Sequence, residues 1–214
     1  PRPTARSTPA SGPISVDGRL TESSWEEADP FGNFVQSKPR AGYPATEPTV
    51  VRLLHDSKYI YVGAICYISD PDNLTITSLE RDYESLNSDA FGVTFDTFLD
   101  RSSSFMFFVN PKGAVRDAQS FDDARIRDLA WDGILEVRTR IDSTAWTVEM
   151  AIPWTSLRFD PAKQEQVWGA NFFRRVRFKD EDSFWAPIDR RNKVYTMSKA
   201  GTIRGLGQLD ARSE

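Results

Sequence analysis

The sequence is poor in the residues on which most enzymes and cross-linked proteins depend. Its 214 residues include one cysteine, Cys66, and one histidine, His55. A single cysteine cannot form an internal disulfide, and Cys66 lies in an apolar run, so we expect a buried and inert thiol. No zinc motif, phosphate-binding loop or Ser-His-Asp arrangement is present, and nothing singles out a pair of facing carboxylates. We therefore expect a protein that is not an enzyme.

The sequence also lacks an excess of positive charge and any long hydrophobic run. The 27 Lys and Arg residues are outnumbered by 31 Asp and Glu residues, which gives a net charge of −4. Nucleic acid is excluded as the main partner because a phosphate backbone selects a strongly basic face. No apolar run approaches the roughly 20 residues that a membrane span requires, so we expect no transmembrane segment within this sequence.

Short apolar segments with period-two alternation recur along the chain, and turn residues separate them. The expected strands span 49–55, 59–68, 90–97, 104–109, 135–141, 146–152, 167–179 and 203–209. A short helix is expected over 22–28 with Thr21 as its N-cap, and one helical turn over 153–157. The pattern predicts an all-β fold, a two-sheet antiparallel β-sandwich (jelly-roll-like) with one or two short helices.

The remaining segments divide the chain into three parts. Residues 1–13 are rich in Pro, Ser and Thr, which predicts an extended arm or linker. Residues 14–209 form the sandwich module, and 210–214 form a tail. Within the module, residues 116–132 are expected to form a long acidic loop, and long loops in compact domains are often functional.

Four segments carry a family resemblance. These are ISVDGRL at 14–20 followed by Trp25, the hairpin from VRLLHD at 51–56 to YIYV at 59–62, SDAFGVTFD at 88–96, and WTVEMAIP at 146–153. Together they resemble the family 9 carbohydrate-binding modules and their DOMON-like relatives. A narrower match, in 96–101, 109–113, 131–133 and 152–159, is similar to the N-terminal module of a bacterial family of uncharacterised proteins with a C-terminal β-barrel domain. The resemblance implies a β-sandwich, a bacterial source and export to the periplasm or the cell surface.

The resemblance also shows departures at the sugar-binding positions. Sugar-binding members carry an acidic residue early in the central strand and an arginine on the next strand. Gly92 and Phe108 stand at these positions here. Members also hold the sugar between two tryptophans, and just before Asp89 only Tyr83 is available for stacking.

Aromatic residues in predicted loops are the candidates for stacking on sugar C–H faces. Trp131 lies in the acidic loop and Trp185 follows a charged turn, and with Tyr83 they form the candidate ligand site. The alternative is that the two tryptophans anchor their loops to the sandwich.

Acidic and basic clusters suggest two further sites. The resemblance implies structural calcium, and its candidate ligands are the loop residues Asp122, Asp123, Asp128 and Asp132. The alternative is a solvated acidic loop, and no other cofactor is expected. The alternation of 172–179 places Phe173 on one strand face with Arg175, Arg177 and Lys179. These three cations are the candidate contact for an anionic surface, or else they pair with acidic residues of a neighbouring strand.

Two hypotheses for the function follow. In the first, the chain is a non-catalytic extracytoplasmic binding module that recognises a glycan or a protein surface. In the second, it is an accessory subunit that docks on the periplasmic side of a bacterial membrane protein complex through the arm at 1–13 and a face of the sandwich.

Overall fold

The computed structural model describes residues 2–83 and 87–209, and the expected tail at 210–214 lies outside them. Strands make up most of this part of the chain, with one α-helix, α1 (Ser23–Glu27), and short 3-10 turns. The strands are β1 (Thr4–Pro9), β2 (Val35–Lys38), β3 (Thr49–His55), β4 (Tyr59–Tyr67), β5 (Ala90–Asp96), β6 (Ser104–Val109), β7 (Val115–Phe121), β8 (Ile126–Asp128), β9 (Glu136–Ile141), β10 (Ala145–Pro153), β11 (Trp168–Val176), β12 (Glu181–Phe184) and β13 (Gly201–Arg204). The 3-10 turns are η1 (Pro71–Asn73), η3 (Trp154–Ser156), η4 (Arg177–Lys179) and η5 (Met197–Lys199).

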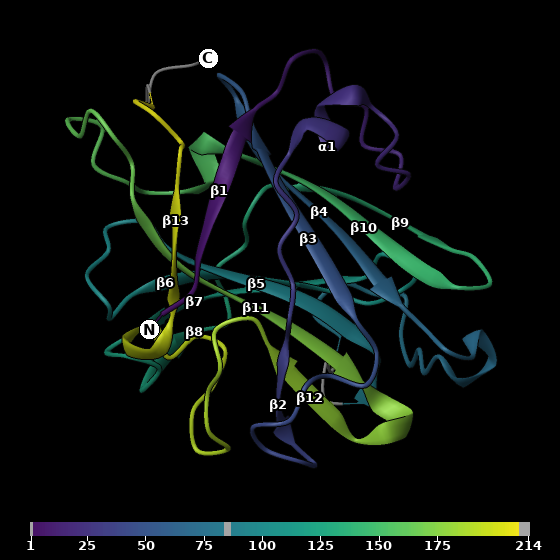
Figure 1. The fold of residues 1–214 in the computed structure, drawn as a ribbon. Helices are drawn as coiled ribbons and strands as arrows, with labels where there is room; N and C mark the ends of the chain where they lie inside the picture. The colour runs from purple at the N-terminus through teal and green to yellow at the C-terminus, as the bar shows by residue number, and fades with distance from the viewer. Residues whose placement is uncertain (1, 84–86, 210–214) are drawn as a thin grey trace.

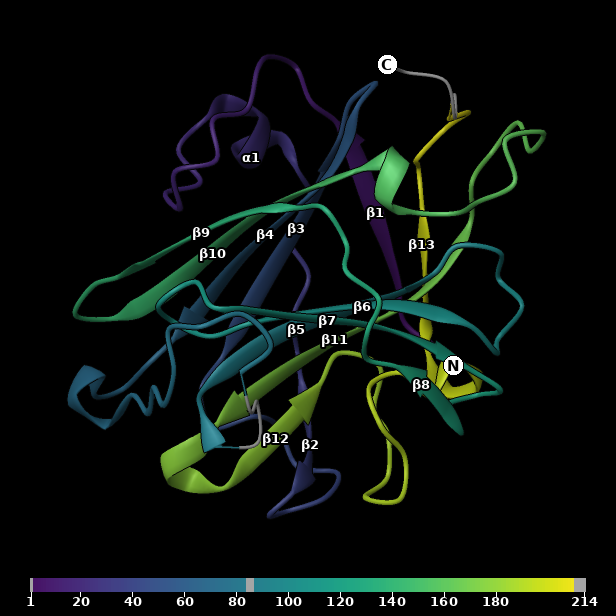
Figure 2. The same cartoon turned by 180° about the vertical axis from the view of Figure 1, so that it is seen from behind.

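The strands form two layers, which we call sheet A and sheet B. Sheet A has the order β8-β7-β6-β5-β11-β13, and β12 pairs with β11 and with β2 at one end. Sheet B has the order β3-β4-β10-β9. Figures 1 and 2 show the two layers, with β13 and β1 along the side on which they join. The predicted β-sandwich is confirmed.

Strand β1 belongs to both sheets. Thr4, Ala5 and Arg6 pair with β13, whereas Ser7, Thr8 and Pro9 pair with β3. Both pairings are parallel, so the sheet is mixed rather than purely antiparallel. The residues predicted to form an arm therefore include a strand at the junction of the sandwich. An arm wrapped on a partner would have to give up both pairings.

The core lies between the sheets and follows from the alternation of the strands. Aromatic side chains of β5 and β11 meet aliphatic and aromatic side chains of β3, β4 and β10, all of them buried. The large fully buried side chains of this core include Phe91, Phe95, Phe107, Trp168 and Phe172 from sheet A, with Leu53, Ile60, Trp146 and Met150 from sheet B. Every residue of β5 and β11 is buried, because these strands lie in the middle of sheet A with neighbouring strands on both sides.

Two predicted ranges, 116–132 and 167–179, require correction. The expected acidic loop at 116–132 contains β7 and β8, whose many polar side chains hide the strand pattern. The expected strand at 167–179 ends at Val176, because residues 177–179 form η4 and Asp180 then adopts a left-handed φ of 49°. Within the described ranges, no helix is long and apolar enough to cross a membrane.

Candidate functional site

The outer face of sheet A, which points away from the core, carries a hollow of about 420 Å³. Successive side chains of a strand point to opposite faces. Phe107 and Phe172 therefore enter the core, while Phe108 and Phe173 face the hollow. The apolar floor is formed by Met106 and Phe108 of β6, Ala118 of β7, Phe173 of β11 and Phe184 of β12.

The ring of Phe108 lies over Gly92 at the centre of this floor. The two residues are paired across β5 and β6, and a Cβ atom at position 92 would overlap the Phe108 ring. Phe108 also meets Phe173 edge to face, with the ring centroids 6.0 Å apart. The two departures from the sugar-binding pattern are therefore complementary, because the missing side chain makes room for the ring.

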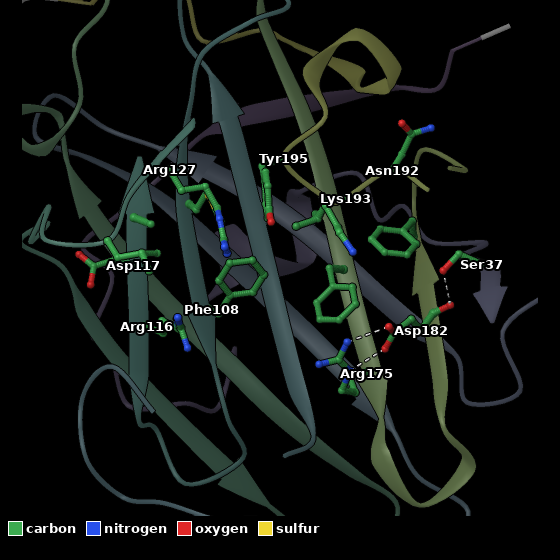
Figure 3. Close-up of a pocket in the computed structure, with 16 residues that line it drawn as sticks. Ser37, Phe108, Arg116, Asp117, Arg127, Arg175, Asp182, Asn192, Lys193 and Tyr195 are labelled. Carbon is green, nitrogen blue, oxygen red and sulfur yellow. Dashed lines mark hydrogen bonds and ion pairs between the residues drawn. The ribbon is translucent and has the colours of Figure 1, made fainter. Parts of the chain in front are cut away.

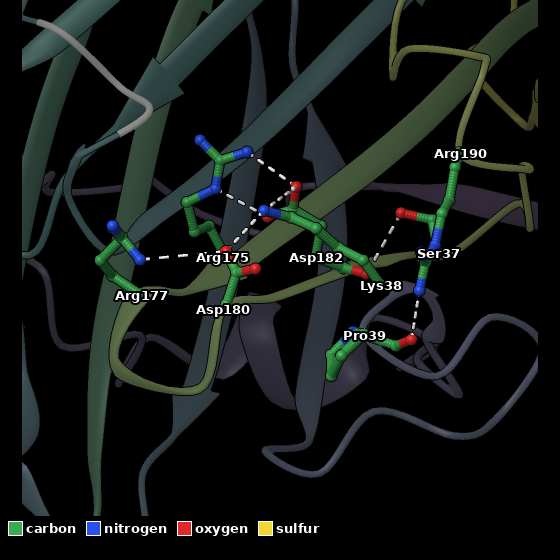
Figure 4. A network of polar contacts seen from close by, with 8 residues as sticks. All are labelled: Ser37, Lys38, Pro39, Arg175, Arg177, Asp180, Asp182 and Arg190. Atoms are coloured by element: carbon green, nitrogen blue, oxygen red, sulfur yellow. Dashed lines mark hydrogen bonds and ion pairs between the residues drawn. The ribbon is translucent and has the colours of Figure 1, made fainter.

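A loop after β12 forms one wall of the hollow. Val194 is buried in the apolar cluster of the floor, and its carbonyl oxygen accepts a hydrogen bond of 3.1 Å from Thr94 Oγ1. Arg190 donates to the carbonyl oxygens of Ser37, at 3.1 Å, and of Pro39 (Figure 4). These contacts fix the backbone that presents Asn192, Lys193 and Tyr195 to the hollow.

Charged side chains surround the aromatic floor (Figure 3). Arg175 donates from Nε and Nη2 to the two carboxylate oxygens of Asp182, each at 2.7 Å. Lys38 Nζ lies 3.6 Å from the same carboxylate. The guanidinium of Arg127 lies over the Tyr195 ring, 5.7 Å from its centroid. The arrangement can bind a ligand with an apolar face and polar edges.

The structure places the predicted stacking residues away from this hollow. Trp185 is buried in the core, with ring centroids 5.1 Å from Phe31 and 5.5 Å from Phe172. Tyr83 is buried too, and burial raises the pKa of its hydroxyl. Trp185 lies among the core rings and does not line the hollow, so it has the anchoring role that was the alternative.

Trp131 is half-buried and packs on the core from its rim. Its ring lies 5.4 Å from Phe105 and 5.7 Å from Phe107. It is not among the residues that line the hollow. Trp131, Trp185 and Tyr83 are thus not brought together as a stacking set.

The four candidate calcium ligands are also kept apart by separate partners. Asp122 pairs with Arg125 at 3.4 Å, and Asp123 accepts from the Ser198 amide at 2.9 Å. Asp128 accepts from the Ala130 amide at 3.0 Å, while Asp132 pairs with Arg81. In the part of the chain that the structure describes, no group of three or more His, Cys, Asp or Glu side chains could hold a metal ion.

The predicted basic stripe is divided by the turn at η4. Arg175 faces the hollow and pairs with Asp182, whereas Lys179 contacts Thr46, at 3.0 Å, and Glu47. Arg177 lies 3.9 Å from Asp180. Of the three candidates, Arg175 alone lines the hollow.

Comparisons with known proteins point to one fold. No family model matches the sequence, and no curated protein matches it. A family 9 carbohydrate-binding module from Caldicellulosiruptor kristjanssonii, solved with cellotriose, is 16% identical with a TM-score of 0.67, over 99% of this chain and 98% of that one. The same source gives a family 9 module with glucose, 16% identical with a TM-score of 0.69, over 99% of this chain and 100% of that one.

A candidate carbohydrate-binding protein from Bacteroides uniformis ATCC 8492 is also similar in structure. It is 12% identical with a TM-score of 0.78, over 96% of this chain and 100% of that one. The alignments span nearly the whole of each chain, so the fold is that of a family 9 carbohydrate-binding module.

Proposed function

We propose that this protein is a non-catalytic binding module that works outside the cytoplasm and holds a glycan in the hollow on the outer face of sheet A. The observation that carries the proposal is the aromatic floor around Phe108 and Phe173, bordered by polar side chains. Sugars bind to proteins through C–H contacts with aromatic rings, while polar side chains take the hydroxyl groups. The hollow, at about 420 Å³, is within the range of small-molecule sites.

The charges at the hollow favour binding over catalysis. Its two lining carboxylates are Asp117 and Asp182, and each is held by an arginine. A general acid or base must be able to exchange a proton with the substrate, and a carboxylate locked in an ion pair is poorly suited to that role. Position 92, where sugar-binding relatives carry an acidic residue, is a glycine.

Export belongs to the same proposal, because a free-standing module meets polymeric glycans in the periplasm or at the cell surface. The fold supports this reading, since its solved neighbours include modules bound to cellotriose and to glucose. Fractionation of the native cells, with immunodetection of the protein, tests the location directly.

A blocking substitution tests the site. Ala118 is a buried floor residue on β7, and Ala118→Trp places a large ring in the hollow without removing a core contact. We expect the variant to lose retention on a glycan array while its unfolding transition stays cooperative. Ile126→Trp is the matched control, because Ile126 is 58% exposed on the neighbouring β8 and lies outside the lining. Equal retention of the two variants would contradict the proposal.

A further inference from the structure

We infer that the ligand of this hollow is an anionic glycan, one whose sugars carry carboxylate or sulfate groups. The inference rests on the proposed function and adds the chemical class of the ligand. It derives from the cations that surround the aromatic floor, which are Arg116, Arg127, Arg175 and Lys193.

The carboxylates at the hollow are already neutralised. Asp182 is shared by Arg175 and by Lys38, which lies outside the lining. Asp117 is held by Arg81, also outside it, with Nη2 3.0 Å from each carboxylate oxygen, and by the Gly133 amide. The negative charge of the lining is therefore compensated by Arg81 and Lys38 from outside the hollow and by Arg175 from within it.

Arg127 and Lys193 supply much of the positive charge that remains. Across the described residues neither side chain takes part in an ion pair. Both are exposed, one on β8 and the other on the loop after β12. Figure 3 shows their charged ends directed toward the floor from the two sides of Tyr195. A ligand on the floor would meet both of them.

This concentration of positive charge is a local property and does not follow from composition. The protein carries a net charge of −4, so a polyanion is repelled by the molecule as a whole. Binding of a polyanion would therefore depend on the cations around the hollow.

The hydrogen-bonding capacity of these groups selects the ligand. Arginine and lysine side chains only donate, and an ionised carboxylate or sulfate group only accepts. The planar fork of Arg127 matches two oxygens of such a group, while Lys193 acts as a point charge. A neutral sugar must have its hydroxyl protons accepted as well, and the carboxylates that could accept them are occupied by Arg81, Arg175 and Lys38.

The test measures retention in affinity gel electrophoresis on four probes. They are polygalacturonate, its methyl ester, dextran sulfate and polyglutamate, a polyanion that contains no sugar. We expect retention by polygalacturonate or dextran sulfate, loss of retention on the methyl ester, and weakening when salt is raised, because salt screens exposed charges. Retention by polygalacturonate alone identifies a carboxylate ligand, and retention by dextran sulfate alone identifies a sulfate ligand. Retention by both probes indicates a site that accepts either group.

The variants Arg127→Ala and Lys193→Ala each lose about tenfold in affinity for the anionic glycan, the effect of one charge-assisted contact. Arg125→Ala and Arg191→Ala are matched controls, since each removes one exposed cation nearby that pairs with its own aspartate and lies outside the lining. All four positions are exposed, so the variants keep the fold.

Several results would overturn the inference. Retention by neutral glycans that Arg127→Ala and Lys193→Ala leave unchanged rejects an anionic ligand but preserves the proposed function. Absence of retention on every glycan rejects both. Equal retention by polyglutamate, or equal losses in the control variants, indicates non-specific attraction or an acidic protein partner and rejects the anionic glycan.

Discussion

Each of the two sheets has an apolar outer face, and the chain covers the face of sheet B more completely than the face of sheet A. The outer face of sheet B is covered by the chain itself, because α1 and its flanking residues pack Trp25 and Ala28 onto Leu54, Tyr61 and Ala151. The outer face of sheet A also has an apolar floor, but the loop residues at its border leave a hollow open. An apolar face that the chain covers contributes stability, whereas one left as a hollow with charges around it is available to a ligand.

The polar groups show the same difference. Under the cover of sheet B, Glu149 accepts from the amides of Asp17 and Gly18, each at 2.8 Å, and from Trp25 Nε1 at 3.1 Å. Both of its carboxylate oxygens are therefore occupied by the covering segment. At the hollow of sheet A, Arg127 and Lys193 keep their charges in solvent.

The largest expected effect is the loss of the cover on sheet B. Trp25 is 2% exposed, and its ring lies against Gly63 of β4, where a Cβ atom would be 2.7 Å from Cζ3. Trp25→Ala removes this packing and the indole hydrogen bond to Glu149, so we expect a loss of about 4 kcal/mol in the free energy of unfolding. Urea titration measures the loss.

The affinity of the hollow for its glycan is the second measurement on the Trp25→Ala variant. If the two faces are independent, folded Trp25→Ala protein binds its glycan with unchanged affinity. Phe178→Ala, at an exposed position outside both faces, is the stability control. A variant as stable as the wild type would show that α1 does not hold the cover in place.

A smaller effect separates the two faces of a single strand. Arg174 and Arg175 are neighbours on β11; Arg174 is fully buried, 4.8 Å from the Trp146 ring centroid and 3.9 Å from Asp89. Among the described residues, none of its three guanidinium nitrogens has a hydrogen-bond partner. Arg174→Met leaves the carboxylate of Asp89 buried without its cation, and we expect a loss of about 3 kcal/mol in the free energy of unfolding.

The double variant Arg174→Met/Asp89→Asn should recover most of that loss, because no buried charge is left unpaired. Arg175→Met should cost less stability, since Asp182 retains Lys38, and should weaken glycan binding instead. Chemical unfolding measures both single variants. A larger loss of unfolding free energy in Arg175→Met than in Arg174→Met would contradict the prediction.

The sequence predicts the fold well where one local pattern decides it. Strands β3, β6 and β10 alternate or run apolar between clear turns, and the predicted ranges agree with them to within a residue. Strand β1 was missed because TARSTP has little to bury and its partner β13 lies almost two hundred residues away in the chain. Local signals cannot report a pairing of that kind.

The site was harder to predict because, like the pairing of β1 with β13, it brings together residues that lie far apart in the sequence. Gly92 and Phe108 were identified as departures, but the floor that contains Phe108 is assembled from β6, β7, β11 and β12. Trp185 was taken for a surface residue because it follows a charged turn. The turn is indeed charged, but β12 runs along the sandwich and directs Phe184 to the hollow and Trp185 to the core. Phe184 and Trp185 are neighbours with opposite roles, and the sequence does not show which of them faces the core and which faces the hollow.

The smallest expected effect concerns β1, where the two faces are joined. His55 is the only histidine, and Nδ1 of its buried ring lies 2.8 Å from the Ser7 hydroxyl across the β1–β3 pair. Burial lowers the pKa of His55 from its usual 6.5, against an opposing effect of Asp56. The folded state then binds fewer protons than the unfolded state. The contribution of His55 to the free energy of unfolding is therefore fully present above pH 6.5 and falls as the pH drops from 6.5 toward the lowered pKa.

Urea titrations between about pH 5 and 7 should show this decrease in the free energy of unfolding. His55→Gln should abolish it, because no other side chain titrates there at its ordinary pKa. A slope of the same sign that persists in His55→Gln would contradict the assignment to His55. Glu149 beneath α1 cannot produce that slope, because burial raises the pKa of its carboxyl group and the folded state then binds more protons as the pH falls.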